Sequence, residues 1–231
     1  ITSVDINFGT GPAVQTSVWN AAHDATTGDS TSSTGTAILV RSDLSDDSEI
    51  TEADIDRAFV PFDTSSIPSS AVISSASLNI FVTAKTNVDN DTLDFITVVR
   101  TDNADYTNLV NPDFNNAGAV TNPTEGVDTG QRKDITSITT SAYLVFTLNA
   151  TGRGWIAKSG EASNCSTASG ISCFGLREGH DALNSQIVSN FGGGNSITFS
   201  SAEATGTAND PFLSVTYTVP NLFAPWMFEP F

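Results

Sequence analysis

The chain has few basic residues and very few lysines. Lys and Arg account for 9 of its 231 residues, against 26 Asp and Glu, which gives a formal net charge of −17. Nucleic-acid-binding proteins neutralise phosphates with clustered basic side chains, so this composition excludes a nucleic-acid partner. The acidity favours solubility through self-repulsion. Acidic loops can also supply the oxygen ligands that calcium prefers.

Long apolar runs and catalytic motifs are also missing. No stretch approaches the ~20 apolar residues of a membrane-spanning helix, so we expect no membrane span. The sequence contains no G-x-S-x-G, H-E-x-x-H or Walker-type loop, and we therefore expect no catalysis. No signal segment is evident, and a chain that opens at Ile1 instead of Met suggests a processed product.

Only two cysteines are present, Cys165 and Cys173, in the polar loop NCSTASGISC. Either they are unrelated thiols or they form a disulfide, which would stabilise the fold by roughly 2–3 kcal/mol on the loop-entropy model. We expect the disulfide, and with it an oxidising location: secreted, at a cell surface or at a virion surface. Two thiols and two histidines make a poor zinc site.

What the sequence has in abundance is short alternating apolar runs separated by turn residues. The clearest is residues 57–82, in which Ala58, Val60 and Phe62 share one face of a strand and Phe59 lies on the other. A polar turn over residues 63–68 joins it to a second strand, giving a predicted hairpin. The inward positions of that second strand are Ala76, Leu78, Ile80 and Val82.

The rest of the chain is interpreted in the same way. We predict strands over residues 4–8, 14–19, 37–40, 93–100, 143–148, 174–176, 197–199 and 212–217, a polar loop over 21–36 and an acidic loop over 42–56 with a helical turn at 51–54. A long irregular stretch covers 101–130, and a short helix covers 151–158. Eight to ten short strands predict an all-β fold, a single antiparallel β-sandwich with jelly-roll topology over residues 1–217.

Four stretches give the chain a resemblance to a known family. They are RAFVPFDTSSIPSSAVISSASL from residue 57, LNATGRGWI from 148, FGLREGHD from 174 and TFSSAEATGTANDPFLSVTY from 198; WNAAHDATTG from 19 is a further, looser match. Together they resemble the DNRLRE-type β-sandwich family of secreted and surface proteins. The resemblance implies an extracellular jelly roll; some relatives are carbohydrate-binding modules, and others belong to surface-layer, adhesive or virion-associated proteins.

Each of the two histidines precedes an aspartate, as His23-Asp24 and His180-Asp181. If the two loops meet, Asp24, Glu178 and Asp181 could ligate calcium, the one cofactor the sequence suggests, with the histidines as outer neighbours or as ligand-binding residues. Alternatively, both aspartates accept backbone N–H bonds and tie down their loops, with each histidine packed beside them.

Other charged residues are interpreted as structural. Arg57 with Glu203, and Arg177 with Glu178, are candidates for buried arginine–carboxylate pairs. The run DNDTLD, with Asp89, Asp91 and Asp94, lacks the glycine and terminal glutamate of an EF-hand loop, so we interpret it as a solvated turn.

Sugar binding would need exposed aromatic side chains that stack on pyranose rings. Trp19 and Tyr106 are the candidates, whereas Trp155 lies in an apolar motif and is expected in the core.

The final stretch, TVPNLFAPWMFEPF, here called the tail (residues 218–231), is the most unusual piece of the chain. Its three prolines favour an extended path. Left in water it would expose a large apolar patch, so we expect it to pack on its own domain or on a neighbouring copy. The predicted assembly contacts are Phe223, Trp226, Met227, Phe228 and Phe231.

Two functions follow from these observations. The first is a non-catalytic extracellular surface or structural module that forms a homo-oligomer, or binds neighbouring surface subunits, through the tail. The alternative is a carbohydrate-binding module whose partner is an extracellular polysaccharide.

Overall fold

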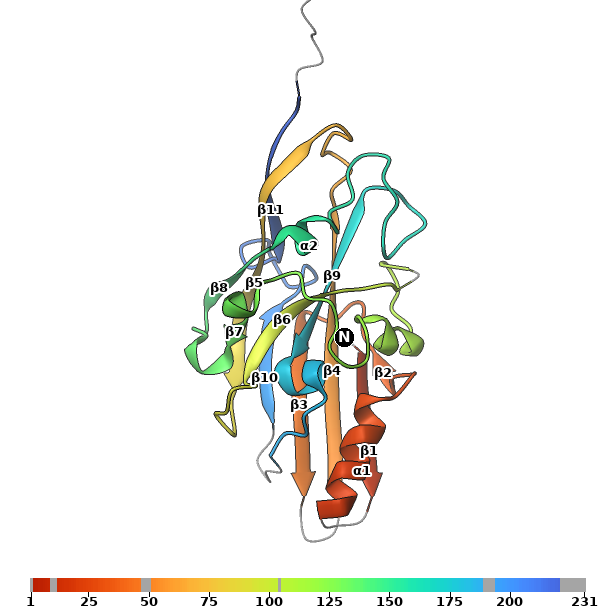
Figure 1. Ribbon diagram of the computed structural model, residues 1–231, viewed down its shortest axis with the longest axis vertical. Coiled ribbons are helices and arrows are strands. Elements are labelled where there is room, and N and C mark those ends of the chain that lie inside the picture. The colour runs from red at the N-terminus through yellow and green to blue at the C-terminus, as the bar shows by residue number, and fades with distance from the viewer. Residues whose placement is uncertain (1, 9–11, 47–50, 104, 189–193, 221–231) are drawn as a thin grey trace, which may run out of the picture.

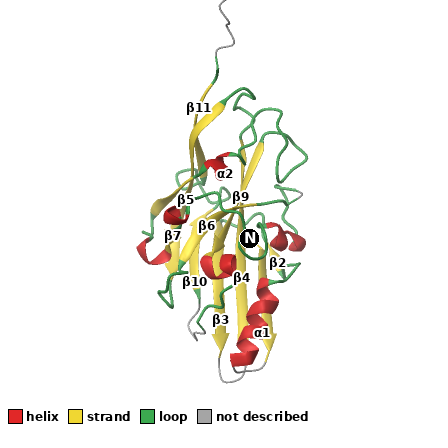
Figure 2. Ribbon diagram, in the orientation of Figure 1, coloured by secondary structure: helices red, strands yellow, loops and turns green. Residues whose placement is uncertain are grey.

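A computed structural model of the protein describes residues 2–8, 12–46, 51–103, 105–188 and 194–220. Strands dominate these residues (Figure 2). The strands are β1 (Thr2–Phe8), β2 (Ser30–Thr31), β3 (Ala37–Asp46), β4 (Thr51–Asp63), β5 (Val72–Thr86), β6 (Phe95–Arg100), β7 (Lys133–Asp134), β8 (Ala142–Thr147), β9 (Ile171–Glu178), β10 (Asn195–Ser200) and β11 (Phe212–Thr218). The helices are α1 (Pro12–His23), α2 (Ala150–Arg153) and α3 (Gly179–Leu183), with 3-10 turns η1 (Asn111–Asn116), η2 (Thr129–Gln131) and η3 (Ile135–Ser137).

The described strands form one antiparallel sheet that curls into a nearly closed, barrel-like structure (Figure 1). The strand order is β11-β5-β10-β3-β4-β9-β6-β7, with β1 and β2 added beside β4 and β8 added beside β5. The predicted all-β class is confirmed. A chain rich in Thr, Ser and Val, with turn residues between short apolar runs, favours such pairing over helices.

The expected alternation in β4 and β5 is confirmed. Val60 and Leu78 lie in the largest buried cluster, whereas Phe59 packs on the opposite face of β4 against Val99 and Ala117. Strand β4 is therefore covered on both faces, as its sequence predicts.

The predicted hairpin between these two strands is wrong. In the described residues β4 pairs with β1, β3 and β9, while β5 pairs with β8, β10 and β11. The turn itself is present, because Asp63 Oδ1 accepts hydrogen bonds from Ser65 N at 3.0 Å and Ser65 Oγ at 2.6 Å. The local chemistry of a turn does not decide which strands pair after it.

The predicted strand over residues 14–19 is also wrong, because this segment belongs to α1. Val14, Val18 and Ala22 recur every four residues, and together with Trp19 they face one buried cluster. Pro12 is the first helical residue, a position where its missing N–H costs nothing. The helix packs along β1 and β4 (Figure 1).

The predicted acidic loop over 42–56 is formed largely by the ends of β3 and β4. Leu44 and Ile55 point inward and are buried. Between the strands, Arg41 Nε binds Asp56 Oδ2 at 2.7 Å and Arg41 Nη1 binds Asp54 Oδ2 at 3.0 Å. One arginine therefore offsets the repulsion among aspartates that strand pairing brings together.

Candidate functional site

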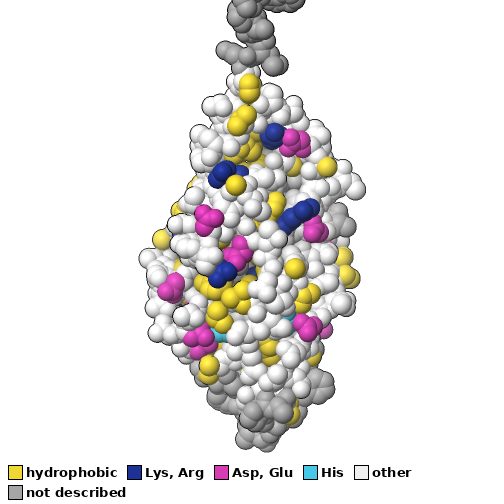
Figure 3. Space-filling view, viewed as in Figure 1, with side chains coloured by type: hydrophobic (Ala, Val, Ile, Leu, Met, Phe, Trp, Pro, Cys, Tyr) yellow, Lys and Arg dark blue, Asp and Glu magenta, His cyan; other side chains and the backbone are white. Residues whose placement is uncertain are grey.

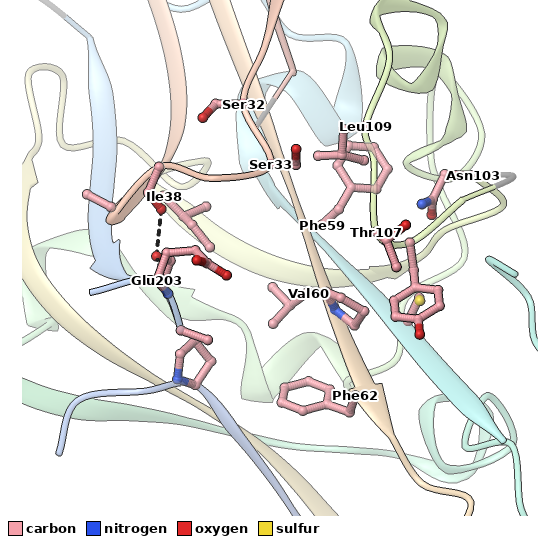
Figure 4. Close-up of a pocket in the computed structure, with 18 residues that line it drawn as sticks. Ser32, Ser33, Ile38, Phe59, Val60, Phe62, Asn103, Thr107, Leu109 and Glu203 are labelled. Atoms are coloured by element: carbon pink, nitrogen blue, oxygen red, sulfur yellow. Dashed lines mark hydrogen bonds between the residues drawn. The ribbon is translucent and has the colours of Figure 1, made fainter. Parts of the chain in front are cut away.

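A cleft with a volume of about 410 Å³ opens beside β4 (Figure 4), and it is called here the β3–β4 cleft. Four parts of the chain far apart in sequence form it together with β4. Its lining consists of Ser32, Ser33, Gly35, Ala37 and Ile38 around the start of β3, Phe59, Val60, Pro61 and Phe62 of β4, Asn103, Tyr106, Thr107 and Leu109 after β6, Cys173 of β9, and Ser201, Ala202, Glu203 and Pro211 before β11.

The cleft lies where β3 and β4 separate. These strands pair only as far as Arg41 opposite Asp56; β10 pairs with residues 37–42 of β3 and is the only partner strand of residues 37–40 in the described part of the chain. Residues 58–63 of β4 pair with β9, which is their only partner strand within the described part of the chain. A strand has two edges. The second edge of residues 58–63 therefore has no partner strand in the described part of the chain.

The lining residues of β4 indicate that the cleft follows this edge. Phe59 to Phe62 are consecutive, and successive side chains of a strand point to opposite faces. In Figure 4, Val60 and Phe62 project from β4 on the side of Ile38, whereas Phe59 projects the other way, toward Leu109. An extended peptide can add to such an edge through its backbone, with alternate side chains entering pockets.

Sequence reasoning did not identify this edge, although Pro61 gave a signal for it. Proline has no N–H to donate to a ladder, and within sheets it is largely confined to edges and bulges. Pro61 is solvent-exposed near the end of β4, directly after six buried residues.

The disulfide helps to build one wall of the cleft. Cys165 and Cys173 are bonded, which confirms the predicted bridge. Both are buried with Ile171, and half-buried Tyr106 packs against this small cluster. Of the two aromatic residues proposed to bind sugar, Tyr106 is the one that borders the cleft.

Asp181 lies outside the cleft, in a buried pair of salt bridges. Arg57 Nη2 contacts Asp181 Oδ1 at 2.6 Å, and Arg177 Nε contacts Asp181 Oδ2 at 2.6 Å. All three side chains are at most 1% exposed. Burial favours the neutral acid, but the charges of Arg177 and Arg57 outweigh it and hold the pKa of Asp181 well below its usual value.

This arrangement corrects two predictions. Both oxygens of Asp181 are held by arginines, so it does not fit the role of a calcium ligand. The predicted buried arginine–carboxylate pairs exist, but with Asp181 as their shared acid; Glu203 is exposed at the cleft.

Trp19 and His23 are core residues and not exposed ligand-binding groups. Trp19 is 1% exposed, and its Nε1 donates to Asn184 Oδ1 at 3.2 Å. His23 Nε2 lies 3.0 Å from the carbonyl oxygen of Asp181. Both side chains therefore tie α1 to the region of α3.

The remaining residues proposed for calcium are engaged separately. Asp24 contacts the Nδ1 of His23 at 2.6 Å and has a largely exposed side chain. Glu178 is buried and accepts from the backbone N of His180 at 2.8 Å, as the N-cap of α3. His180 itself is 1% exposed, which does not suit a role in stacking on a sugar.

The interpretation of DNDTLD as a solvated turn is wrong for two of its three aspartates. Asp94 is 3% exposed, and the side chain of Asp89 is 4% exposed. Only Asp91, with 47% of its side chain exposed, faces solvent as predicted.

Acidic side chains are dispersed over the face shown in Figure 3 and do not gather in one patch. No helix in the described residues has the length and apolar character needed to cross a bilayer. The predicted tail contacts Phe223, Trp226, Met227, Phe228 and Phe231 lie outside the described residues.

Comparison with protein-family models gives no match, and comparison with curated proteins gives none either.

Proposed function

We propose that the chain is a non-catalytic structural module of an extracellular surface, a jelly-roll β-sandwich whose copies assemble head to tail. The tail of one copy lies in the β3–β4 cleft of the next and pairs with the open edge of β4. One observation supports this above the others: residues 58–63 of β4 have an edge without a partner strand in the described chain, and an apolar cleft runs along it.

The tail has the chemistry of an occupant for this cleft. It has five large apolar side chains in its last nine residues, and its prolines favour an extended path. Ile38, Phe59, Val60 and Phe62 offer apolar contacts to alternate side chains of an added strand. Binding of the tail in the cleft would remove apolar area of both the tail and the cleft from water in each copy.

The direction of β11 favours a neighbouring copy over the chain's own cleft. Pro211 borders the cleft just before β11 begins at Phe212. The strand then runs for seven residues, or about 23 Å at ~3.3 Å per residue, toward the upper end of the molecule in Figure 1. Tyr217 and Val219, at this far end, are 39% and 51% exposed.

An extracellular location is part of this proposal. The Cys165–Cys173 disulfide supports it, because disulfides persist in oxidising compartments.

Light scattering after size-exclusion chromatography tests the assembly. We expect the full chain to form oligomers at micromolar concentration and a chain that ends at Thr218 to be monomeric. A synthetic peptide of residues 219–231 should then bind the shortened chain, as measured by fluorescence anisotropy. A monomeric full chain, or no binding of the peptide, would contradict the proposal.

Two matched substitutions localise the contact. Ile38→Lys places a charge in the cleft, whereas Val145→Lys places the same charge on β8, at a site 43% exposed. We expect Ile38→Lys to weaken peptide binding at least tenfold and Val145→Lys to leave it unchanged. Equal effects of the two would show that the tail binds elsewhere.

A second candidate function is carbohydrate binding in the same cleft. Half-buried Tyr106, beside the polar side chain of Asn103, offers an aromatic face next to a hydrogen-bonding group. Affinity electrophoresis on neutral and acidic polysaccharides, with the chain that ends at Thr218, tests it. Retardation that Tyr106→Ala abolishes would favour this function, and no retardation on any glycan would exclude it for those tested.

A further inference from the structure

Three side chains from two separate parts of the chain converge near the start of α3. His180 Nε2 lies 3.3 Å from Asp89 Oδ2 and 3.6 Å from Asp91 Oδ2. The three ligand atoms all lie within 4.8 Å of one another. Asp89 and Asp91 lie in the loop between β5 and β6, whereas His180 lies in α3.

The second polar atom of each side chain is already engaged. Asp89 Oδ1 accepts from Asn195 Nδ2 at 2.9 Å, and Asp91 Oδ1 accepts from the backbone N of Leu93 at 2.5 Å. His180 Nδ1 lies 3.0 Å from Glu178 Oε1. These contacts fix the orientation of all three side chains and leave Asp89 Oδ2, Asp91 Oδ2 and His180 Nε2 directed toward one another.

Asp89 Oδ2 is the atom that needs a partner. Its side chain is 96% out of solvent, and apart from the ion-pair contact with His180 Nε2 this oxygen has no hydrogen-bond partner among the described residues. A buried carboxylate oxygen without a partner is costly, because it has lost its hydration.

The charge around this oxygen is not balanced by basic residues. Asp94 and Glu178 lie in the same cluster, both bound by the amide of Asn195. Among the described residues, none of the four carboxylates has a Lys or Arg within 4.0 Å, and His180 is the only ionisable base paired with them. A cation would offset the repulsion among these carboxylates.

We propose that Asp89 Oδ2, Asp91 Oδ2 and His180 Nε2 bind a divalent transition-metal ion, zinc being the best fit. Ligand atoms around a tetrahedral ion with bonds of about 2.1 Å lie about 3.4 Å apart, close to the two separations measured from His180. Three protein ligands leave a fourth position, which the solvent-exposed side of Asp91 opens to water.

The surroundings of His180 favour zinc over calcium. Calcium takes oxygen ligands, whereas imidazole nitrogen suits zinc and its neighbours in the series. A metal-binding histidine usually donates its other ring N–H to a carboxylate, and Glu178 is placed to accept it. The site joins the β5–β6 loop to α3 and does not involve the β3–β4 cleft, so it is independent of the proposed assembly.

Zinc binding is measured on the full chain, without a metal-affinity tag, after treatment with a chelator. Dialysis against zinc followed by elemental analysis should give one bound ion per chain, and the thermal unfolding midpoint should rise with zinc. Asp89→Asn and His180→Gln should each reduce zinc affinity at least tenfold. Asp128→Asn, which removes the same charge at an exposed position, should leave the zinc affinity unchanged.

Folding and metal choice are controlled in the same experiment. Asp91→Asn lies at an exposed position, so it should fold normally, and it should still weaken zinc binding. Cooperative unfolding of each metal-free variant checks the fold. The proposal is overturned if zinc does not bind, if it binds all of these variants equally, or if calcium raises the unfolding midpoint and zinc does not.

Discussion

Asp181 is the residue on which the packing of α1, β4 and β9 depends. It accepts hydrogen bonds from Arg57 on β4 and Arg177 on β9, while its own carbonyl contacts His23. Arg57 also donates to the carbonyls of Phe114 and His23. Each guanidinium nitrogen of Arg57 thus donates to at least one oxygen, which lowers the cost of burying its charge.

Replacing Asp181 by Asn tests this network. The substitution keeps the size of the side chain but leaves Arg57 and Arg177 buried without a counter-charge. We expect the free energy of unfolding to fall by about 3–5 kcal/mol, measured by urea denaturation. Asp128→Asn, at an exposed site, should change it by less than about 0.5 kcal/mol. A small loss at Asp181 would mean that water or relaxation solvates the arginines.

The same carboxylate gives the protein a defined dependence on pH. The pKa of Asp181 is lowered in the folded chain, so its contribution to stability is full above the unfolded value of about 3.9 and is lost as the pH falls below it. The difference in unfolding free energy between wild type and Asp181→Asn should therefore be constant from pH 5 to 7 and shrink below pH 4. A difference that grew on acidification would contradict the assigned pairing.

At the scale of elements, the disulfide loop should support the wall of the cleft. The bridge spans eight positions, and its cysteines pack with Ile171 and Tyr106. The double substitution Cys165→Ser and Cys173→Ser should cost roughly 2–3 kcal/mol by chain entropy. Urea denaturation measures this loss.

Binding of the tail peptide should weaken in the same variant, because Tyr106 would lose its support. Substituting Ser169, which is exposed in the loop and lies outside the cluster, by Ala is the control and should change neither quantity. Undiminished peptide binding by the double variant would show that this wall is not part of the contact.

At the scale of the whole molecule, net charge opposes the proposed assembly. Copies that each carry −17 repel one another, and salt screens this repulsion as the Debye length falls from about 30 Å at 0.01 M to about 8 Å at 0.15 M. We therefore expect the apparent association constant of the full chain to rise with sodium chloride over this range, as measured by sedimentation. Dissociation by salt would instead indicate an interface held by ion pairs.

The sequence alone determined the all-β class, the inward positions of β5, and the disulfide. Each depends on a pattern that is local in the chain. Leu78 and Ile80 alternate with less apolar positions, and the two cysteines close a short loop. Helix α1 could also have been predicted from the sequence, because Val14, Val18 and Ala22 recur at helical spacing after Pro12.

Only the tertiary structure decided which strands pair and which charges meet. Arg57 and Asp181 are 124 positions apart, and Asp89 and His180 are brought together only by the packing of the β5–β6 loop against α3. The open edge of β4 likewise depends on where β3 and β9 lie. A carboxylate or an apolar strand has many possible partners of equal chemistry along the chain, and burial in one particular fold selects among them.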